Sequence, residues 1–266
     1  MKPASAAEWS LVFVSIGLLV GGAESLAARG DLLAGTYSEG VLAAFISRGS
    51  GVRRFPSIAT RFRYAVAIQI VQLVCVVLCV AFSTARVWLL GVVLITHLVR
   101  MRCSPVGLGG SDQMTTVVLV GLVVFFSDPG SEVGHAGLIF VAAESCLAYF
   151  VSGFAKLMCP IWRSGRASAG ILTTRSFGHR YAGPFVERHG NLARVADWGT
   201  ISFEMLFSVG LLVGGTPLLA ILVAGGLFHY GVAVLMGLND FFWPFVSTYP
   251  ALLYTSVLLV GHSAVF

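Results

Sequence analysis

Long apolar runs separated by short polar segments make up most of this chain. A membrane-spanning helix needs about 20 mainly apolar residues, and by that measure the pattern predicts about eight spans. Because the pattern shows no internal repeat and no low-complexity stretch, we expect one all-α domain over residues 1–266, a polytopic membrane bundle without a soluble domain. The expected spans are 9–27, 64–83, 87–100, 113–127, 135–157, 199–214, 217–238 and 245–265.

The composition agrees with a membrane protein. Of the 266 residues, 57% are hydrophobic and 11% are charged, whereas soluble domains carry about 25% charged residues. No small-residue cleavage site follows the first apolar run, which is therefore expected to remain as a helix. The net charge of +5 comes from loop arginines and does not form a nucleic-acid-binding patch. We expect a multi-pass protein of the cell inner membrane that contacts lipid and binds no nucleic acid.

Three loops, 28–63, 100–112 and 158–198, hold most of the arginines. With eight spans these loops share one side, which the excess of basic residues in cytoplasmic loops would place inside, with both termini outside. A functional arginine cluster would produce the same bias. Residues 38–46 and 167–177 mix apolar and polar positions and predict short helices at the membrane interface. Such helices either anchor the protein to lipid headgroups or form a lid over a pocket.

Ionisable side chains within spans are costly and mark candidate functional sites. Glu144 is either a neutral glutamic acid bonded to a neighbouring helix or a functional group. Glu204 is expected to pair with an arginine of the basic side. His229 is either a buried histidine satisfied by a hydroxyl or a ligand contact, because the glycines around it permit close approach. The remaining ionisable residues of the spans are Glu24 and His97, both expected near the interface, and Lys156.

Lys156 is the one lysine of the chain besides Lys2; every other basic residue is an arginine. It ends a long apolar run, and two interpretations are open. The stem could lie in lipid while the ammonium reaches water. Alternatively, the side chain faces the bundle interior, where burial disfavours the charged form and the amine becomes a general base. No metal-binding motif is present. Cys103 and Cys159 would be free thiols on the cytoplasmic side and could form a disulfide on the opposite side.

The run from Tyr149 to Gly165, with Tyr149-Phe150, Gly153, Lys156-Leu157, Trp162 and Gly165 at its fixed positions, resembles a segment shared by two groups of membrane proteins. These are the vitamin K-dependent γ-glutamyl carboxylases and the bacterial HTTM proteins, named for a horizontally transferred transmembrane domain. The sequence of this run is similar to that of short bacterial members, among them the membrane maturation protein of the sporulation-delaying toxin system. Further similar segments are Phe228-His229, Met236-Gly237-Leu238, Phe245, Tyr249-Pro250, Gly109–Gln113 and Tyr37–Gly40.

The resemblance implies a role for two of these residues. Lys156 matches the lysine taken as the base that deprotonates reduced vitamin K, and His229 matches a later histidine of the family. It also implies a quinol-type cofactor, with O2 and CO2 if carboxylase chemistry is kept, a peptide substrate and a soluble partner protein. The chain has Ala155 where the carboxylases have a second lysine. The carboxylase site opens to the lumen, whereas the arginine bias places Lys156 at the cytoplasmic face.

Two hypotheses from different classes follow. In the first, the chain is a membrane enzyme that modifies or matures a secreted peptide, with Lys156 as base and His229 placing a cofactor or a developing oxyanion. Arg163 and Arg166 would hold carboxylates. In the second, it is a non-catalytic scaffold, immunity or export-assisting subunit; a transporter is a weaker alternative. The expected cofactor- or substrate-binding residues of the enzyme are Trp162, Arg163, Arg166, Glu144, Glu204 and Tyr230.

Overall fold

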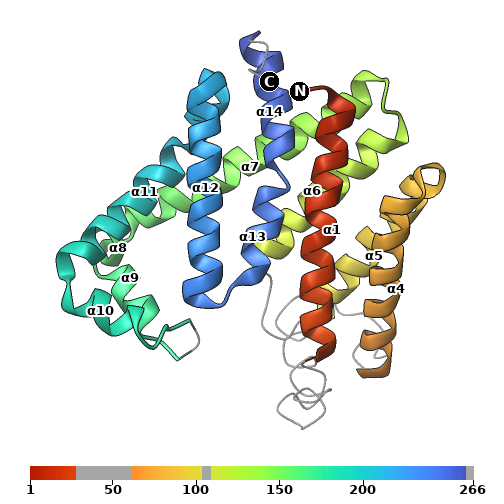
Figure 1. The fold of residues 1–266 in the computed structure, drawn as a ribbon. Coiled ribbons are helices and arrows are strands. Elements are labelled where there is room, and N and C mark those ends of the chain that lie inside the picture. Colours follow the sequence, from red (N-terminus) through yellow and green to blue (C-terminus); the bar gives the residue numbers. More distant parts are fainter. Residues whose placement is uncertain (28–61, 104–108, 176, 262–266) are drawn as a thin grey trace. The chain divides into compact units, whose positions relative to one another are not determined.

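The computed structural model describes residues 1–27, 62–103, 109–175 and 177–261 (Figure 1). All regular secondary structure in these ranges is helical, which confirms the all-α prediction. Seven of the described helices are long and apolar enough to cross a membrane, and Val66–Ala81 is a shorter apolar helix. The protein thus has the character of a multi-pass helical membrane protein. The predicted interfacial helix at 38–46 and the motif at Tyr37–Gly40 lie outside the described residues.

Each predicted span contains a helix. The first seven correspond to α1 Pro3–Ala27, α4 Phe62–Ala81, α5 Arg86–Cys103, α6 Gly110–Ser127, α7 Glu132–Met158, α11 Gly190–Val213 and α12 Gly215–Met236. The chief difference among them is α11, which begins at Gly190 instead of 199 and so extends the span at its polar end. Gly225 and Gly226 lie inside the continuous helix α12.

The last predicted span, 245–265, overlaps the candidate membrane span Asn239–Val260, and this span is divided into two helices. It consists of α13 (Asn239–Val246) and α14 (Tyr249–Val260), separated at Ser247 and Thr248. Proline has no backbone N–H, and Pro250 lies in the first turn of the second helix, where no intrahelical bond is lost. The hydroxyls of Ser247 and Thr248 donate to the carbonyls of Pro244 and Phe245, both at 2.7 Å, and so satisfy the end of α13.

The described chain divides into two compact units, Leu11–Gly137 and Met1–Ser10 with Leu138–Phe266. In the first unit, α4 packs on α5 and α5 packs on α6. Arg100 donates to the Gln72 side chain at 2.7 Å, and His97 Nε2 lies 3.1 Å from the carbonyl oxygen of Asp112. His97 is 4% exposed, so its side chain lies in the interior of this unit.

The second unit carries the residues singled out by the sequence. Three short helices connect α7 to α11: α8 Pro160–Arg163, α9 Ala167–Leu172 and α10 Ala182–Arg188. The predicted short helix at 167–177 is thus present in its first part, as α9. Figure 1 shows the three short helices gathered beside the amino-terminal end of α11, and α9 and α10 pack on each other and on that helix.

A stripe of four polar side chains runs along one face of α7. The polar stripe consists of Ser145, Tyr149, Ser152 and Lys156, spaced by three or four residues, which places them on the same side of an α-helix. Ser145 Oγ lies 3.1 Å from Thr248 Oγ1, and Tyr149 Oη lies 2.7 Å from His229 Nε2. The polar stripe therefore faces the neighbouring helices of the unit and positions the candidate site.

We expect Gly225→Ala to destabilise the protein. A Cβ at Gly225 would lie 2.6 Å from the hydroxyl of Tyr249 and 3.3 Å from Phe203 Cζ, and overpacking of this kind costs about 1–3 kcal/mol. The gain in helix propensity, at most about 1 kcal/mol, only partly offsets it. Gly226→Ala is the control, since a Cβ there would lie 4.0 Å from the nearest atom of another helix, Tyr249 Cε2. Thermal unfolding should show a lower midpoint for the first variant alone; equal midpoints would contradict this packing.

Candidate functional site

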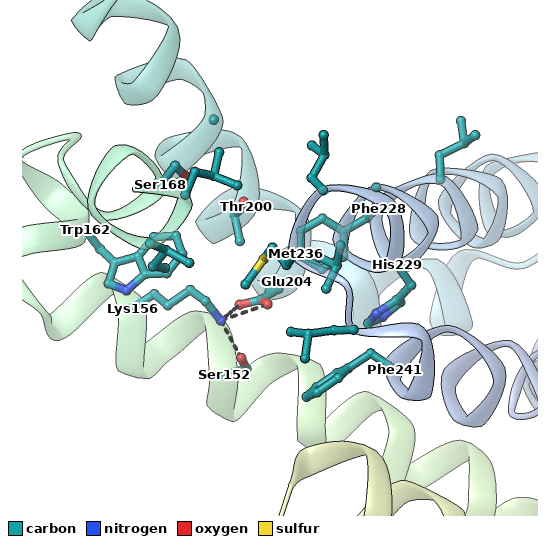
Figure 2. A pocket seen from close by; sticks show the side chains of 18 of the residues that line it. Ser152, Lys156, Trp162, Ser168, Thr200, Glu204, Phe228, His229, Met236 and Phe241 are labelled. Atoms are coloured by element: carbon teal, nitrogen blue, oxygen red, sulfur yellow. Dashed lines mark hydrogen bonds and ion pairs between the residues drawn. The ribbon is translucent and has the colours of Figure 1, made fainter. Parts of the chain in front are cut away.

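A cavity of ≈ 690 Å³ lies within the second unit, between α7, α11, α12, α13 and the short helices. This volume is in the range of small-molecule sites, which are mostly apolar with a few polar groups. The lining fits that description (Figure 2): its polar members are few and stand among aliphatic and aromatic side chains. The polar side chains are Ser152, Lys156, Ser168, Thr200, Glu204 and His229, and the aromatic ones are Tyr149, Trp162, Phe228, Phe241 and Phe245.

Lys156 forms an ion pair with Glu204 at the wall of this cavity. The Nζ atom lies 2.6 Å from Glu204 Oε2 and 2.9 Å from Oε1, and it donates to Ser152 Oγ at 2.6 Å. The side chains are 19% and 6% exposed. The ammonium thus points into the unit, as Figure 2 shows, and not along the lipid. The expectation that Glu204 pairs with an arginine is wrong, because its partner is Lys156.

Close contact between α7 and α11 makes this pair possible. A Cβ at Gly153 would lie 2.9 Å from both Glu204 Cβ and Met205 N. Only glycine permits this approach, one turn before Lys156. Helix α7 ends at Met158, and α8 starts with Pro160 at its first turn, which turns the chain back over the lysine.

Trp162 of α8 completes the surroundings of Lys156. Its ring centroid lies 5.3 Å from the Nζ atom, within the distance at which a cation is attracted to an aromatic face. Glu204, Ser152 and Trp162 therefore hold the Lys156 ammonium in one position. Trp162 and Glu204 were both expected to bind a ligand, and both line the cavity.

His229 forms a second polar position in the same cavity. Its Nε2 atom lies 2.7 Å from Tyr149 Oη, and its ring stacks on Phe245 with centroids 4.2 Å apart and planes at 17°. Tyr149 in turn stacks on Phe207 at 3.7 Å. The Nδ1 atom of His229 is buried and has no hydrogen-bond partner among the described residues. Such an atom is available to a ligand.

Four of the predicted site residues lie apart from the cavity. Arg163 and Arg166 are exposed on the short helices, and Arg166 donates to Ser164 Oγ. Tyr230 is 59% exposed, since the residue after His229 points about 100° away from it around the helix. Glu144 is half-buried on α7, with no hydrogen bond or ion pair to a described residue. The structure brings together Lys156, Glu204, Trp162 and His229 from the predicted set.

Two polar residues of the cavity lining, Tyr149 and Ser152, and one residue beside it, Asp197, were not predicted as site residues. Tyr149 and Ser152 precede Lys156 by seven and four residues, so helical periodicity alone could have placed them on the lysine's face. Asp197, on α11, is 0% exposed. It accepts from the backbone N–H groups of Ala167 at 2.8 Å and Ser168 at 2.9 Å, and from the Ser168 hydroxyl. It serves as the N-terminal cap of α9 from another helix, and no local sequence signal links these positions.

Cys75, Cys79, Cys146 and Cys159 are free thiols, and the side chain of Cys103 lies outside the described part. In the described ranges, no group of three or more histidine, cysteine, aspartate or glutamate side chains could hold a metal ion. Comparisons with family models, with curated proteins and with solved structures find no match to this chain. The arrangement of the cavity residues therefore carries the functional argument.

Proposed function

We propose that this chain is a multi-pass membrane enzyme that removes a proton from a largely apolar ligand, with Lys156 as the base. The observation that carries the proposal is the Lys156–Glu204 pair, held by Ser152 at the wall of a mostly apolar cavity. A charged pair is costly in such surroundings. A cavity that contains such a pair offers its ligand a proton acceptor. After the proton transfer, the lysine is a cation beside the ligand anion.

The pair can reach its basic state without a change in its total charge. The ammonium of Lys156 can pass a proton to Glu204, which leaves a neutral amine and a neutral carboxylic acid. This form avoids separated charges in an apolar environment. The amine then takes the proton of an acidic ligand hydroxyl and becomes an ammonium again, next to the ligand oxygen. Ser152 accepts one of the N–H bonds throughout and fixes the direction of the amine.

The cavity residues fit a reduced quinone. The ring would lie among Phe228, Phe241 and Phe245, with Lys156 and the unpartnered Nδ1 of His229 as polar contacts. When bound, a quinol supplies a weakly acidic hydroxyl and reducing equivalents, and O2 and CO2 would join it if carboxylase chemistry is kept. We further propose a secreted peptide as the substrate, with or without a soluble partner protein, and the cell inner membrane as the location.

The first test is ligand binding to the full chain in lipid nanodiscs. Reduced phylloquinone, added without oxygen, is expected to quench tryptophan fluorescence because Trp162 lines the cavity. Gly231 lines it too, and no atom lies within 4 Å of a Cβ placed there. Gly231→Phe should therefore fill part of the cavity and weaken binding by about tenfold or more, equivalent to ~1.4 kcal/mol or more. Gly226→Phe, on the same helix but outside the lining, is the matched control.

The second test is chemical. Cells that produce the wild-type chain should release a peptide whose intact mass differs from that in cells producing the Lys156→Arg variant. An unchanged mass, together with no quinol binding and a stoichiometric co-purifying partner, would replace the enzyme with the scaffold hypothesis. If Gly231→Phe and Gly226→Phe reduce quinol binding equally, the quinol does not bind in this cavity.

A further inference from the structure

The segment between α7 and α11 concentrates positive charge on the protein surface. Residues 159–198 contain six arginines and two acidic residues, Glu187 and Asp197, and Asp197 is buried as the cap of α9. None of the six arginines forms an ion pair with a residue of the described ranges. All six are exposed, and together we call them the arginine ledge: Arg163, Arg166, Arg175, Arg180, Arg188 and Arg194.

The arginine ledge is built on folded structure. Helices α9 and α10 pack on each other and on α11, and the buried carboxylate of Asp197 fixes the start of α9 through two backbone N–H groups. The opposite side of the same segment lines the cavity with Trp162, Ile171 and Leu172. Arg163, Arg188 and Arg194 thus lie on helices of this packed segment, whereas Arg175 and Arg180 lie in the turn between α9 and α10.

Aromatic side chains lie exposed between these arginines. Phe177, Tyr181 and Phe185 are 43%, 68% and 55% exposed. The guanidinium of Arg180 lies 4.5 Å from the centre of the Tyr181 ring. Because the segment joins two helices that are long and apolar enough to cross a membrane, we expect its ends where the membrane meets water. Aromatic rings are enriched at that depth, and arginines there are attracted to anionic headgroups.

We propose that the arginine ledge binds the phosphate headgroups of anionic phospholipids. Guanidinium groups match phosphate oxygens in charge and geometry, and the exposed rings would be buried at the boundary between headgroups and acyl chains. An acidic peptide would satisfy the arginines but would leave Phe177 and Phe185 in water. A lipid pairs with the arginines and also buries the aromatic rings. Its binding would stabilise the segment that forms the cavity wall. This inference does not depend on the proposed reaction.

The experiment measures lipid preference in the full chain. Nanodiscs are prepared from phosphatidylcholine and phosphatidylglycerol, and the lipids retained by the extracted protein are identified by native mass spectrometry. We expect the wild-type chain to retain phosphatidylglycerol in preference. The triple variant Arg175→Gln, Arg180→Gln, Arg188→Gln should lose about fivefold in preference for each charge removed, on the order of 100-fold in all. The matched triple lysine variant keeps the charge and should retain most of the preference.

Three results would overturn the proposal. The first is equal retention of phosphatidylglycerol by the wild-type chain and the triple glutamine variant, each shown to be folded by its size-exclusion profile. The second is loss of the preference when excess soluble glycerol phosphate is added, which would indicate a site for free phosphate. The third concerns hexaglutamate in pure phosphatidylcholine nanodiscs. If the wild-type chain binds it, and the glutamine variant loses this binding but retains phosphatidylglycerol as the wild-type chain does, the ledge is a peptide site.

Discussion

Replacing Lys156 by methionine is expected to abolish turnover and to destabilise the fold at the same time. Glu204 would remain at the cavity wall without its cation, and removing one partner of a buried pair costs about 3–5 kcal/mol. A positioned general base contributes roughly 10²–10⁴-fold to rate, so activity should fall by at least about that factor. The two effects have different origins, and the chain offers variants that separate them.

The double variant Lys156→Met, Glu204→Leu removes both charges. Replacing a buried ion pair by apolar residues of similar volume is often neutral or stabilising, so its unfolding midpoint should return towards that of the wild-type protein while activity stays absent. Lys156→Arg keeps the charge but has no proton that it can release at neutral pH. It should therefore be folded and inactive. Thermal unfolding and product mass are the two measurements, and full activity of Lys156→Arg would exclude proton transfer by this residue.

Asp197→Ala is expected to have the largest effect on stability away from the Lys156–Glu204 pair. It leaves the backbone N–H groups of Ala167 and Ser168 without their acceptor, and each buried unsatisfied group costs about 1–3 kcal/mol. The loss should be confined at first to α9, because the rest of α11 keeps its contacts. Hydrogen exchange at residues 167–172 should accelerate, and the unfolding midpoint should fall.

Two milder substitutions define the role of this cap. Ser168→Ala removes a hydroxyl donor but leaves both backbone N–H groups bonded to Asp197, so it should affect exchange only slightly. Asp197→Asn retains one carbonyl oxygen and should give an intermediate loss. If exchange over 167–172 is the same in Asp197→Ala as in the wild-type chain, the carboxylate does not hold α9, and the cavity wall is stabilised by apolar packing alone.

The sequence was sufficient for the elements that depend on composition. Apolar runs predicted the spanning helices because a lipid environment requires long, apolar, internally hydrogen-bonded segments. The break at Ser247 and Thr248 was not predicted, because the residues around it are apolar enough for one continuous span. Proline at position 250 was visible in the sequence, but proline within a spanning helix does not always end it.

The candidate site was predictable only in part. Lys156, Glu204 and His229 are all ionisable residues in predicted spans, so the sequence marks each of them as a candidate. Which of them meet depends on how each helix is rotated about its axis. The contact at Gly153 sets the approach of α7 to α11, and a sequence does not reveal which glycine meets which helix. For the same reason Tyr230 and Arg163, adjacent in sequence to His229 and Trp162, lie outside the cavity.

The division of the last span separates two properties of the cavity. Lys156 and Glu204 stand on α7 and α11, which are long continuous helices. Phe241 and Phe245 stand on the short α13, which ends at the hydroxyl-capped break. Substitutions in α13 are therefore expected to reshape the cavity while the Lys156–Glu204 pair keeps its place.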